Sequence, residues 1–155
     1  MNDSENLVQL QHYFQNGITL RMLEDMPKED LQNMASFGWQ KMNEGLFQQA
    51  RNIFYVLVYC DHYNGDYLCS LGLCYQKLGD HHAALLALSQ AGTILVTDPR
   101  PPFLAAQSYR EIGMFGHEMQ ALEVVLQLAH NQLIWHELYH DAAEQLTRCP
   151  AKSRE

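Results

Sequence analysis

Residues 65–98 read GDYLCSLGLCYQKLGDHHAALLALSQAGTILVTD, and they decide the fold because their pattern recurs on both sides. Gly79 lies thirty-four residues after Gly45 and thirty-four residues before Gly113. A small residue precedes each glycine by seven positions, and a large apolar residue follows each by nine. A fixed period of this length indicates stacked structural repeats. The repeat units are 31–64, 65–98 and 99–132.

Each repeated position has a physical role in a pair of packed helices. The small residue lets the two helices of a unit approach closely, and the glycine ends the first helix because it tolerates a left-handed backbone. We expect the large apolar residue to pack toward the next unit. The prediction is an all-α fold, with one domain over residues 1–155. The small positions are Gly38, Gly72 and Ala106, and the large apolar positions are Phe54, Leu88 and Leu122.

This spacing resembles the tetratricopeptide repeat, a family whose helix–turn–helix units stack into a curved solenoid. The middle unit is most similar, with Leu71-Gly72-Leu73-Cys74-Tyr75 followed by Gly79 and Ala84. Unit three departs from the pattern, because Glu118 replaces the small residue of its second helix. From this glutamate we expect looser packing in the third unit.

The flanks also carry helical patterns. Leu7, Leu10 and Phe14 share one helix face, so the N-terminal region 5–30 is expected either to cap the repeats or to support self-association. Pro27 suits a first helical position. At the other end, a last helix over 133–146 is expected within a C-terminal cap region, 133–148.

Composition excludes several classes of protein. Ten Lys and Arg against eighteen Asp and Glu leave a formal charge of −8 over 155 residues, which disfavours nucleic acid as a partner. The N-terminus is acidic, unlike a signal peptide, and no run approaches eighteen apolar residues. We expect a cytoplasmic protein that does not insert into a membrane.

Cysteine and histidine patterns do not predict a cofactor. The four cysteines form no CxxC pair, so we expect buried apolar side chains rather than a zinc or redox site. His136-Glu137-Leu138-Tyr139-His140 matches the HExxH motif of zinc proteases. No third ligand follows at a known spacing, and we expect a solvated helix face, no catalysis and no bound metal. A zinc metalloprotease is the alternative function that this motif would indicate.

The first helices of such repeats line the concave side of the solenoid, at positions 2, 5, 9 and 12 of each unit. Apolar side chains there could take aliphatic anchors, and amides could bond an extended backbone. Trp39 and Phe103 are the expected hot spots, because each offers a large apolar area at low entropy cost. Trp39 carries more weight, since a large aromatic has no structural role at its position. Ordinary core packing is the alternative for Met42 or Leu73. The candidate client-binding residues are Ala35, Trp39, Met42, Asp66, Cys69, Leu73, Gln76, Phe103, Gln107 and Arg110.

Three segments give the chain a more specific resemblance: Asp61-His62-Tyr63, Leu71-Gly72-Leu73-Cys74 and Asp98-Pro99-Arg100-Pro101-Pro102-Phe103. From about Leu7 to Leu146 the sequence is similar to the class II type III secretion chaperones. The resemblance implies a cytoplasmic chaperone that binds hydrophobic, pore-forming translocators before secretion and holds an extended client segment in its groove.

By position, the resemblance implies that Ala35, Trp39 and Met42 form client pockets. It also implies a homodimer in the absence of client, with Leu7, Leu10 and Phe14 as candidate dimerisation residues. A general repeat adaptor that assembles folded partners is the alternative function.

Overall fold

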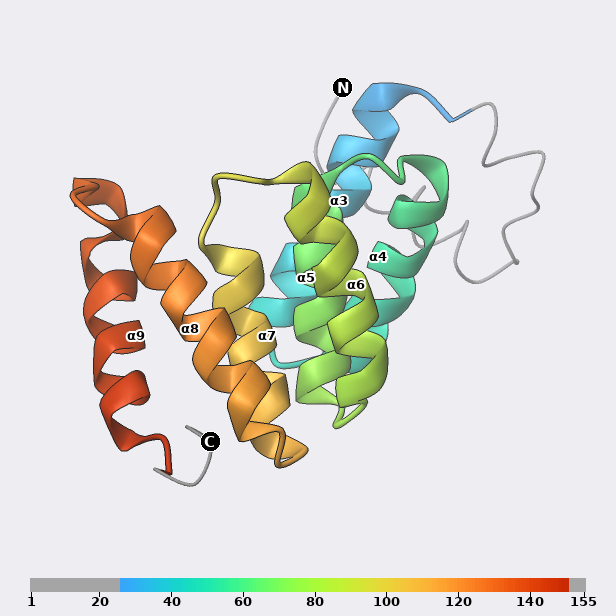
Figure 1. Ribbon diagram of the computed structural model, residues 1–155. Helices are drawn as coiled ribbons and strands as arrows, with labels where there is room; N and C mark the ends of the chain where they lie inside the picture. The colour runs from blue at the N-terminus through green and yellow to red at the C-terminus, as the bar shows by residue number, and fades with distance from the viewer. Residues whose placement is uncertain (1–25, 151–155) are drawn as a thin grey trace.

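The computed structural model describes residues 26–150, which form a row of seven α-helices and one 3-10 turn, without a β-strand in that range (Figure 1). Each helix packs against the next along the chain. The expected all-α repeat fold is confirmed for this part of the chain. The helices are α3 Lys28–Asn43, α4 Phe47–Cys60, α5 Gly65–Lys77, α6 His81–Ile94, α7 Arg100–Glu111, α8 Phe115–Ala129 and α9 His136–Arg148.

The repeated glycines end the first helix of each pair, as predicted. Gly45, Gly79 and Gly113 have φ angles of 77°, 83° and 76°, in the left-handed region that residues with a Cβ rarely adopt. Asn64 and Asp80 begin α5 and α6, because their side chains accept hydrogen bonds from the backbone N–H three residues on.

The small residues bring the two helices of a pair together. A Cβ at Gly72 would lie 2.7 Å from Leu88 Cγ, and one at Gly38 would lie 2.9 Å from the Phe54 ring. The large apolar residues therefore pack on the small residue of their own unit. Phe54 also reaches the next unit, where its ring centroid lies 6.4 Å from that of Tyr67. The sequence analysis predicted the contact with the next unit but not the contact within the same unit.

Glu118 does not loosen the third unit in the way the sequence suggested. Its side chain is 1% exposed, and Arg110 Nε donates a hydrogen bond to Glu118 Oε1 at 2.6 Å. Arg110 Nη2 contacts the same oxygen. Ala106, Leu122 and Val125 around this unit are fully buried. A paired cation thus lets a carboxylate occupy a position that usually needs a small side chain.

The ends of the described chain differ from the sequence prediction in detail. Pro27 is the N-cap of α3 rather than its first residue. A 3-10 turn, η1 Leu133–Trp135, precedes α9, because the Trp135 N–H bonds the Gln132 carbonyl three residues back. Ala142 of α9 is fully buried against the third unit, as expected of a capping helix. The predicted residues Leu7, Leu10 and Phe14 lie outside the described residues.

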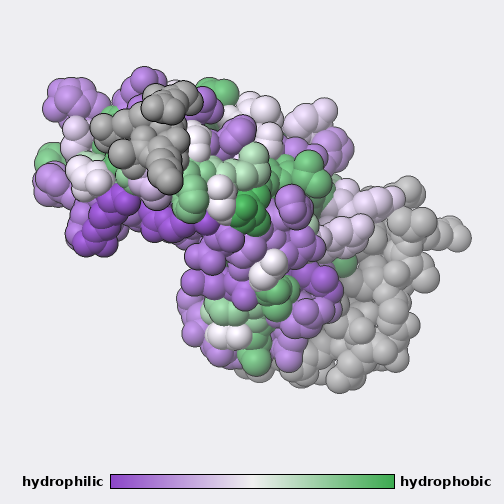
Figure 2. All heavy atoms as spheres, turned by 60° about the horizontal axis from the view of Figure 1, so that its bottom comes forward, coloured by the Kyte–Doolittle hydropathy of each residue, from purple (hydrophilic) through white to green (hydrophobic). Residues whose placement is uncertain are grey.

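Exposed apolar side chains remain on the molecule. Figure 2 shows hydrophobic residues gathered in the middle of one face, between parts that are mostly hydrophilic. Patches of this kind often mark interaction surfaces. Within residues 26–150, no helix combines the length and the hydropathy needed to cross a bilayer.

Candidate functional site

The first helices of the three pairs lie next to one another, since α5 contacts both α3 and α7. We call the surface formed by α3, α5 and α7 the first-helix face. The three helices carry all ten residues predicted to bind a client. Side-chain contacts join each of these helices to the next.

Trp39 joins α3 to α5. Its indole Nε1 donates a hydrogen bond to Ser70 Oγ at 2.8 Å, and the Ser70 hydroxyl in turn donates to the Asp66 carbonyl at 2.9 Å. The Trp39 ring also packs near Phe54 and Tyr67, with centroids 5.8 and 6.4 Å away. Trp39 therefore has a structural role that the sequence prediction denied it. It is still 39% exposed, so part of its ring is open to a ligand.

Arg100 joins α7 to α5 at one edge of the face. Its Nη2 donates to Asp66 Oδ1 at 2.9 Å, and its Nε donates to both carboxylate oxygens of Asp98. These bonds, to Asp98 above all, raise the pKa of Arg100. The guanidinium also lies 5.9 Å from the Trp135 ring. One arginine thereby connects the second unit, the third unit and the capping segment.

Gln76 and Arg110 continue these links along the face. Gln76 Nε2 donates to the Leu104 carbonyl and to Ser108 Oγ, each at 2.8 Å. Arg110 Nη2 donates to Gln145 Oε1 of α9 at 3.1 Å. The Gln76 amide is thus used within the protein, although the sequence analysis assigned such amides to a client backbone. The links fix how neighbouring first helices are placed, which sets the shape of the face.

The remaining candidates divide by burial. Ala35 and Cys69 are 1% and 7% exposed and belong to buried core clusters, so the structure does not present either side chain to a ligand. Burial raises the pKa of the Cys69 thiol to about 11, which keeps it neutral and apolar at physiological pH. The half-buried candidates, which present apolar or amide groups partly to solvent, are Met42, Leu73, Phe103 and Gln107.

The sequence analysis did not predict the hydrogen-bond partners of Trp39, Gln76 and Arg110. Ser70, Ser108 and Gln145 were not predicted, although each lies 31–35 residues after the residue it bonds. That separation is close to the repeat period, so polar residues spaced by about one repeat were the available signal. Their chemistry alone did not distinguish them from solvated side chains.

The HExxH histidines lie together on α9. His136 Nε2 and His140 Nε2 are 3.1 Å apart, and both side chains are exposed. Across residues 26–150, no group of three or more His, Cys, Asp or Glu side chains is placed to hold a metal ion. A histidine pair alone lacks the third protein ligand of a catalytic zinc site.

Two known proteins resemble this chain, one in sequence and one in both sequence and fold. The chain is 24% identical over 129 residues to low calcium response locus protein H of Yersinia pestis, covering 83% of this chain and 77% of that protein. PcrH of Pseudomonas aeruginosa, solved with the chaperone binding region of PopD, superposes with a TM-score of 0.82 at 27% identity, covering 84% of this chain and 98% of PcrH. The resemblance to class II type III secretion chaperones is confirmed.

A further structure agrees on the fold of these secretion chaperones. The Yersinia enterocolitica type III secretion chaperone SycD, solved with a peptide of the translocator YopD, superposes with a TM-score of 0.78 at 23% identity, covering 81% of this chain and 95% of SycD. The search against protein-family models gives no match. The solved relatives are chaperones rather than enzymes.

Proposed function

We propose that this chain is a cytoplasmic chaperone of a bacterial type III secretion system, one that keeps hydrophobic translocators soluble before secretion. It would hold an extended client segment along the first-helix face. Binding would remove client apolar surface from water, at roughly 25 cal/mol per Å². This mechanism needs neither a nucleotide nor a bond-making step, so the proposal assigns the protein no enzymatic activity.

The observation that carries the proposal is the construction of the first-helix face. Four side-chain links hold α3, α5, α7 and α9 in register, from Trp39–Ser70 at one end to Arg110–Gln145 at the other. Between them, apolar groups of Trp39, Met42 and Leu73 remain partly open. A rigid face with open apolar sites binds an extended chain at a low ordering cost on the chaperone's side.

Similarity to two solved chaperones supports the proposal that the client is a translocator. PcrH and SycD share the fold over most of their length. PcrH was solved with the chaperone binding region of PopD, and SycD was solved with a peptide of the translocator YopD. SycD was also solved as an alternative dimer. We extend both properties to this chain, as translocator binding and as a homodimer in the absence of client. Leu7, Leu10 and Phe14 remain the proposed dimer contacts.

Co-expression with a translocator tests the proposal. The wild-type chain should keep the translocator in the soluble fraction. Leu73→Glu should return it to the pellet, because the new carboxylate would be desolvated by an apolar client. Leu86→Glu is the matched control, since Leu86 lies on α6 and is 70% exposed. A translocator that stays insoluble with the wild-type chain would favour the general adaptor instead.

A further inference from the structure

Two histidines that the proposed function does not use converge at the C-terminal end of the helix row. His136 and His140 lie one turn apart on α9, and their Nε2 atoms are 3.1 Å apart. Two imidazoles that bind one metal at about 2.0–2.1 Å, with roughly 90–110° between the bonds, hold their nitrogens about 2.9–3.4 Å apart. The pair therefore already has the spacing of a chelating site.

Both histidines line a pocket beside the turn between α8 and α9, two helices that pack together at the end of the row (Figure 1). The pocket has a volume of about 380 Å³, and its lining includes Ala129 of α8 and Leu133 of η1. Both histidine side chains are exposed, so water and a dissolved metal ion can reach their nitrogens.

A hydrogen bond between the two rings also fits this spacing in the absence of metal. One Nε2 then donates its hydrogen and the other accepts it, so the two imidazoles are in different tautomers. A metal replaces that hydrogen when both rings carry their remaining hydrogen on Nδ1. Because both side chains are exposed, burial does not restrain the small ring rotation that this exchange needs.

The charges of α9 favour a bound cation. No Lys or Arg occurs from residue 111 to residue 147. The cation of α9 lies in its last turn and pairs with a carboxylate one turn earlier. Two carboxylates therefore remain in excess on this helix. The charged residues of α9, apart from its histidines, are Glu137, Asp141, Glu144 and Arg148.

Two positive features near the pair are balanced. Arg100 lies beside the Trp135 ring, but the carboxylates of Asp66 and Asp98 both pair with it. The positive N-terminal end of α9 meets the negative C-terminal end of α8, whose last residue, Ala129, lines the same pocket. The excess carboxylates of α9 thus set the sign of the local charge.

We propose that His136 and His140 bind one divalent transition metal per chain, of the class of Cu²⁺, Ni²⁺ and Zn²⁺, which accept imidazole ligands. Within the described part of the chain no third His, Cys, Asp or Glu completes the site, so water fills the other coordination positions and the metal is exchangeable. The sequence analysis expected no bound metal because a zinc protease needs a third protein ligand. An exchangeable site with two protein ligands does not.

The bound metal would stabilise the capping helix. A metal that bridges residues four apart holds the first turn of α9 helical, and binding to the folded form alone favours that form. Ala142 of α9 is buried against the third unit, and Gln145 accepts a hydrogen bond from Arg110 on the first-helix face. The site thereby supports one end of that face. This inference does not depend on which client the face binds.

Calorimetric titration of the untagged full chain at pH 7.5, after metal has been removed with a chelator, tests the site. The wild type should bind one Cu²⁺ or one Zn²⁺ per chain, and Cu²⁺ should bind more tightly. His136→Ala and His140→Ala should each weaken binding at least about tenfold, because the second bond of a chelate is intramolecular. His62→Ala is the matched control, since His62 is exposed and lies outside the pocket, and it should not change the affinity.

Affinity that survives both substitutions, or that falls equally with His62→Ala, would show an adventitious ion only and overturn the site. One metal held between two chains would also overturn it, because a second copy would then supply ligands. Circular dichroism checks that the variants fold.

Hydrogen exchange gives a readout that depends on where the metal binds. At a free Zn²⁺ concentration ten times the dissociation constant, amide exchange in 136–142 should slow by up to about tenfold. The His140→Ala variant at the same Zn²⁺ concentration should show no such slowing. Unchanged exchange in α9 of the saturated wild type would contradict the proposal.

Discussion

The Trp39 indole donates a hydrogen bond to the Ser70 hydroxyl at 2.8 Å, across the boundary between the first and second helix pairs. The same ring is 39% exposed on the first-helix face. One side chain therefore joins two repeats and also leaves apolar surface exposed on the face where we propose that the client binds. Loss of binding in a Trp39 variant has to be separated from loss of fold.

Trp39→Phe should separate the two roles. Phenylalanine keeps the ring contacts with Phe54 and Tyr67 but loses the hydrogen bond, so the free energy of unfolding should fall by about 1 kcal/mol. Trp39→Ala should also lose the ring packing, and its client binding should weaken by more than about 1 kcal/mol. Urea unfolding and peptide titration measure the two quantities. Wild-type affinity in a folded Trp39→Ala variant would show that the client uses another surface.

Removing the Arg110 cation alone should lower the stability more than removing both members of the Arg110–Glu118 ion pair. Arg110→Met leaves the buried Glu118 carboxylate without its cation, and the free energy of unfolding should fall by about 3 kcal/mol. The double variant Arg110→Met/Glu118→Ala removes the charge as well and should recover most of that loss. Urea denaturation of the single and double variants gives the coupling. Equal stability of the two variants would mean that the ion pair does not explain why Glu118 is tolerated.

Two helix-interior glycines should respond in opposite directions to alanine. At Gly72 the added Cβ would overlap Leu88, so Gly72→Ala should lower the free energy of unfolding by about 1–3 kcal/mol. At Gly92 the space is open, and Gly92→Ala should raise it by about 0.5–1 kcal/mol. Thermal or urea unfolding checks both signs. A destabilising Gly92→Ala would contradict the open space found beside the α6 backbone at this position.

The buried thiols should make stability fall in alkaline solution. Burial raises the pKa of Cys69 to about 11 and of Cys74 to about 12, from a usual value of 9.0. Above pH 9 the unfolded state releases these protons while the folded state retains them. The stabilisation is therefore complete below pH 9 and is lost as the pH rises through 11. Urea unfolding at pH 8, 9 and 10 measures the loss, and a Cys69→Ala/Cys74→Ala variant should show a flatter profile.

The sequence predicted the repeats because their spacing is set by local geometry. Glycines such as Gly79 have to take a left-handed backbone, and Gly72 has to be small, so both positions recur with the period. The chemistry of the first-helix face was less predictable. The bonds of Gln76 to Ser108 and of Arg110 to Glu118 depend on how the helices are placed in space. From residue types alone, these groups looked like client contacts or misfits.

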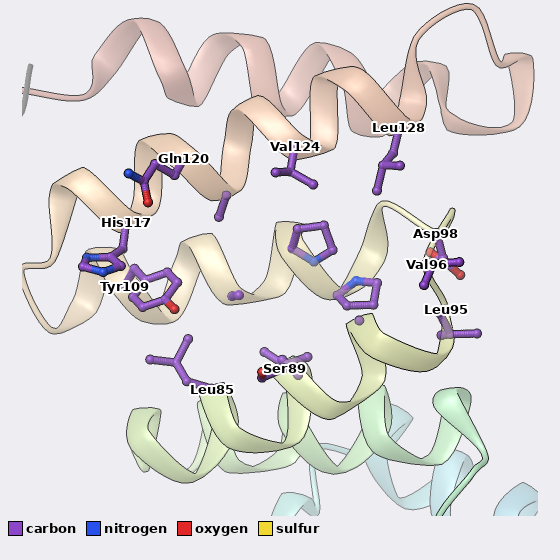
Figure 3. Close-up of a pocket in the computed structure, with 16 residues that line it drawn as sticks. Leu85, Ser89, Leu95, Val96, Asp98, Tyr109, His117, Gln120, Val124 and Leu128 are labelled. Atoms are coloured by element: carbon purple, nitrogen blue, oxygen red, sulfur yellow. The ribbon is translucent and has the colours of Figure 1, made fainter.

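The apolar groove lined by α6, α7 and α8 (Figure 3) was not predicted from the sequence either. Its walls come from two units, and its depth depends on Gly92, which no repeat position requires. Residues such as Val96 and Val124 resemble ordinary core side chains in the sequence. Only the packed structure shows that they remain exposed.

Site-specific photo-crosslinking tests most directly whether the client lies on the first-helix face. A photoreactive residue at Gln107, on α7, should form a covalent adduct with a peptide of the translocator's extended segment. The same residue at Tyr59, on α4 and 54% exposed, should form none. An adduct from position 59 without one from position 107 would contradict the account.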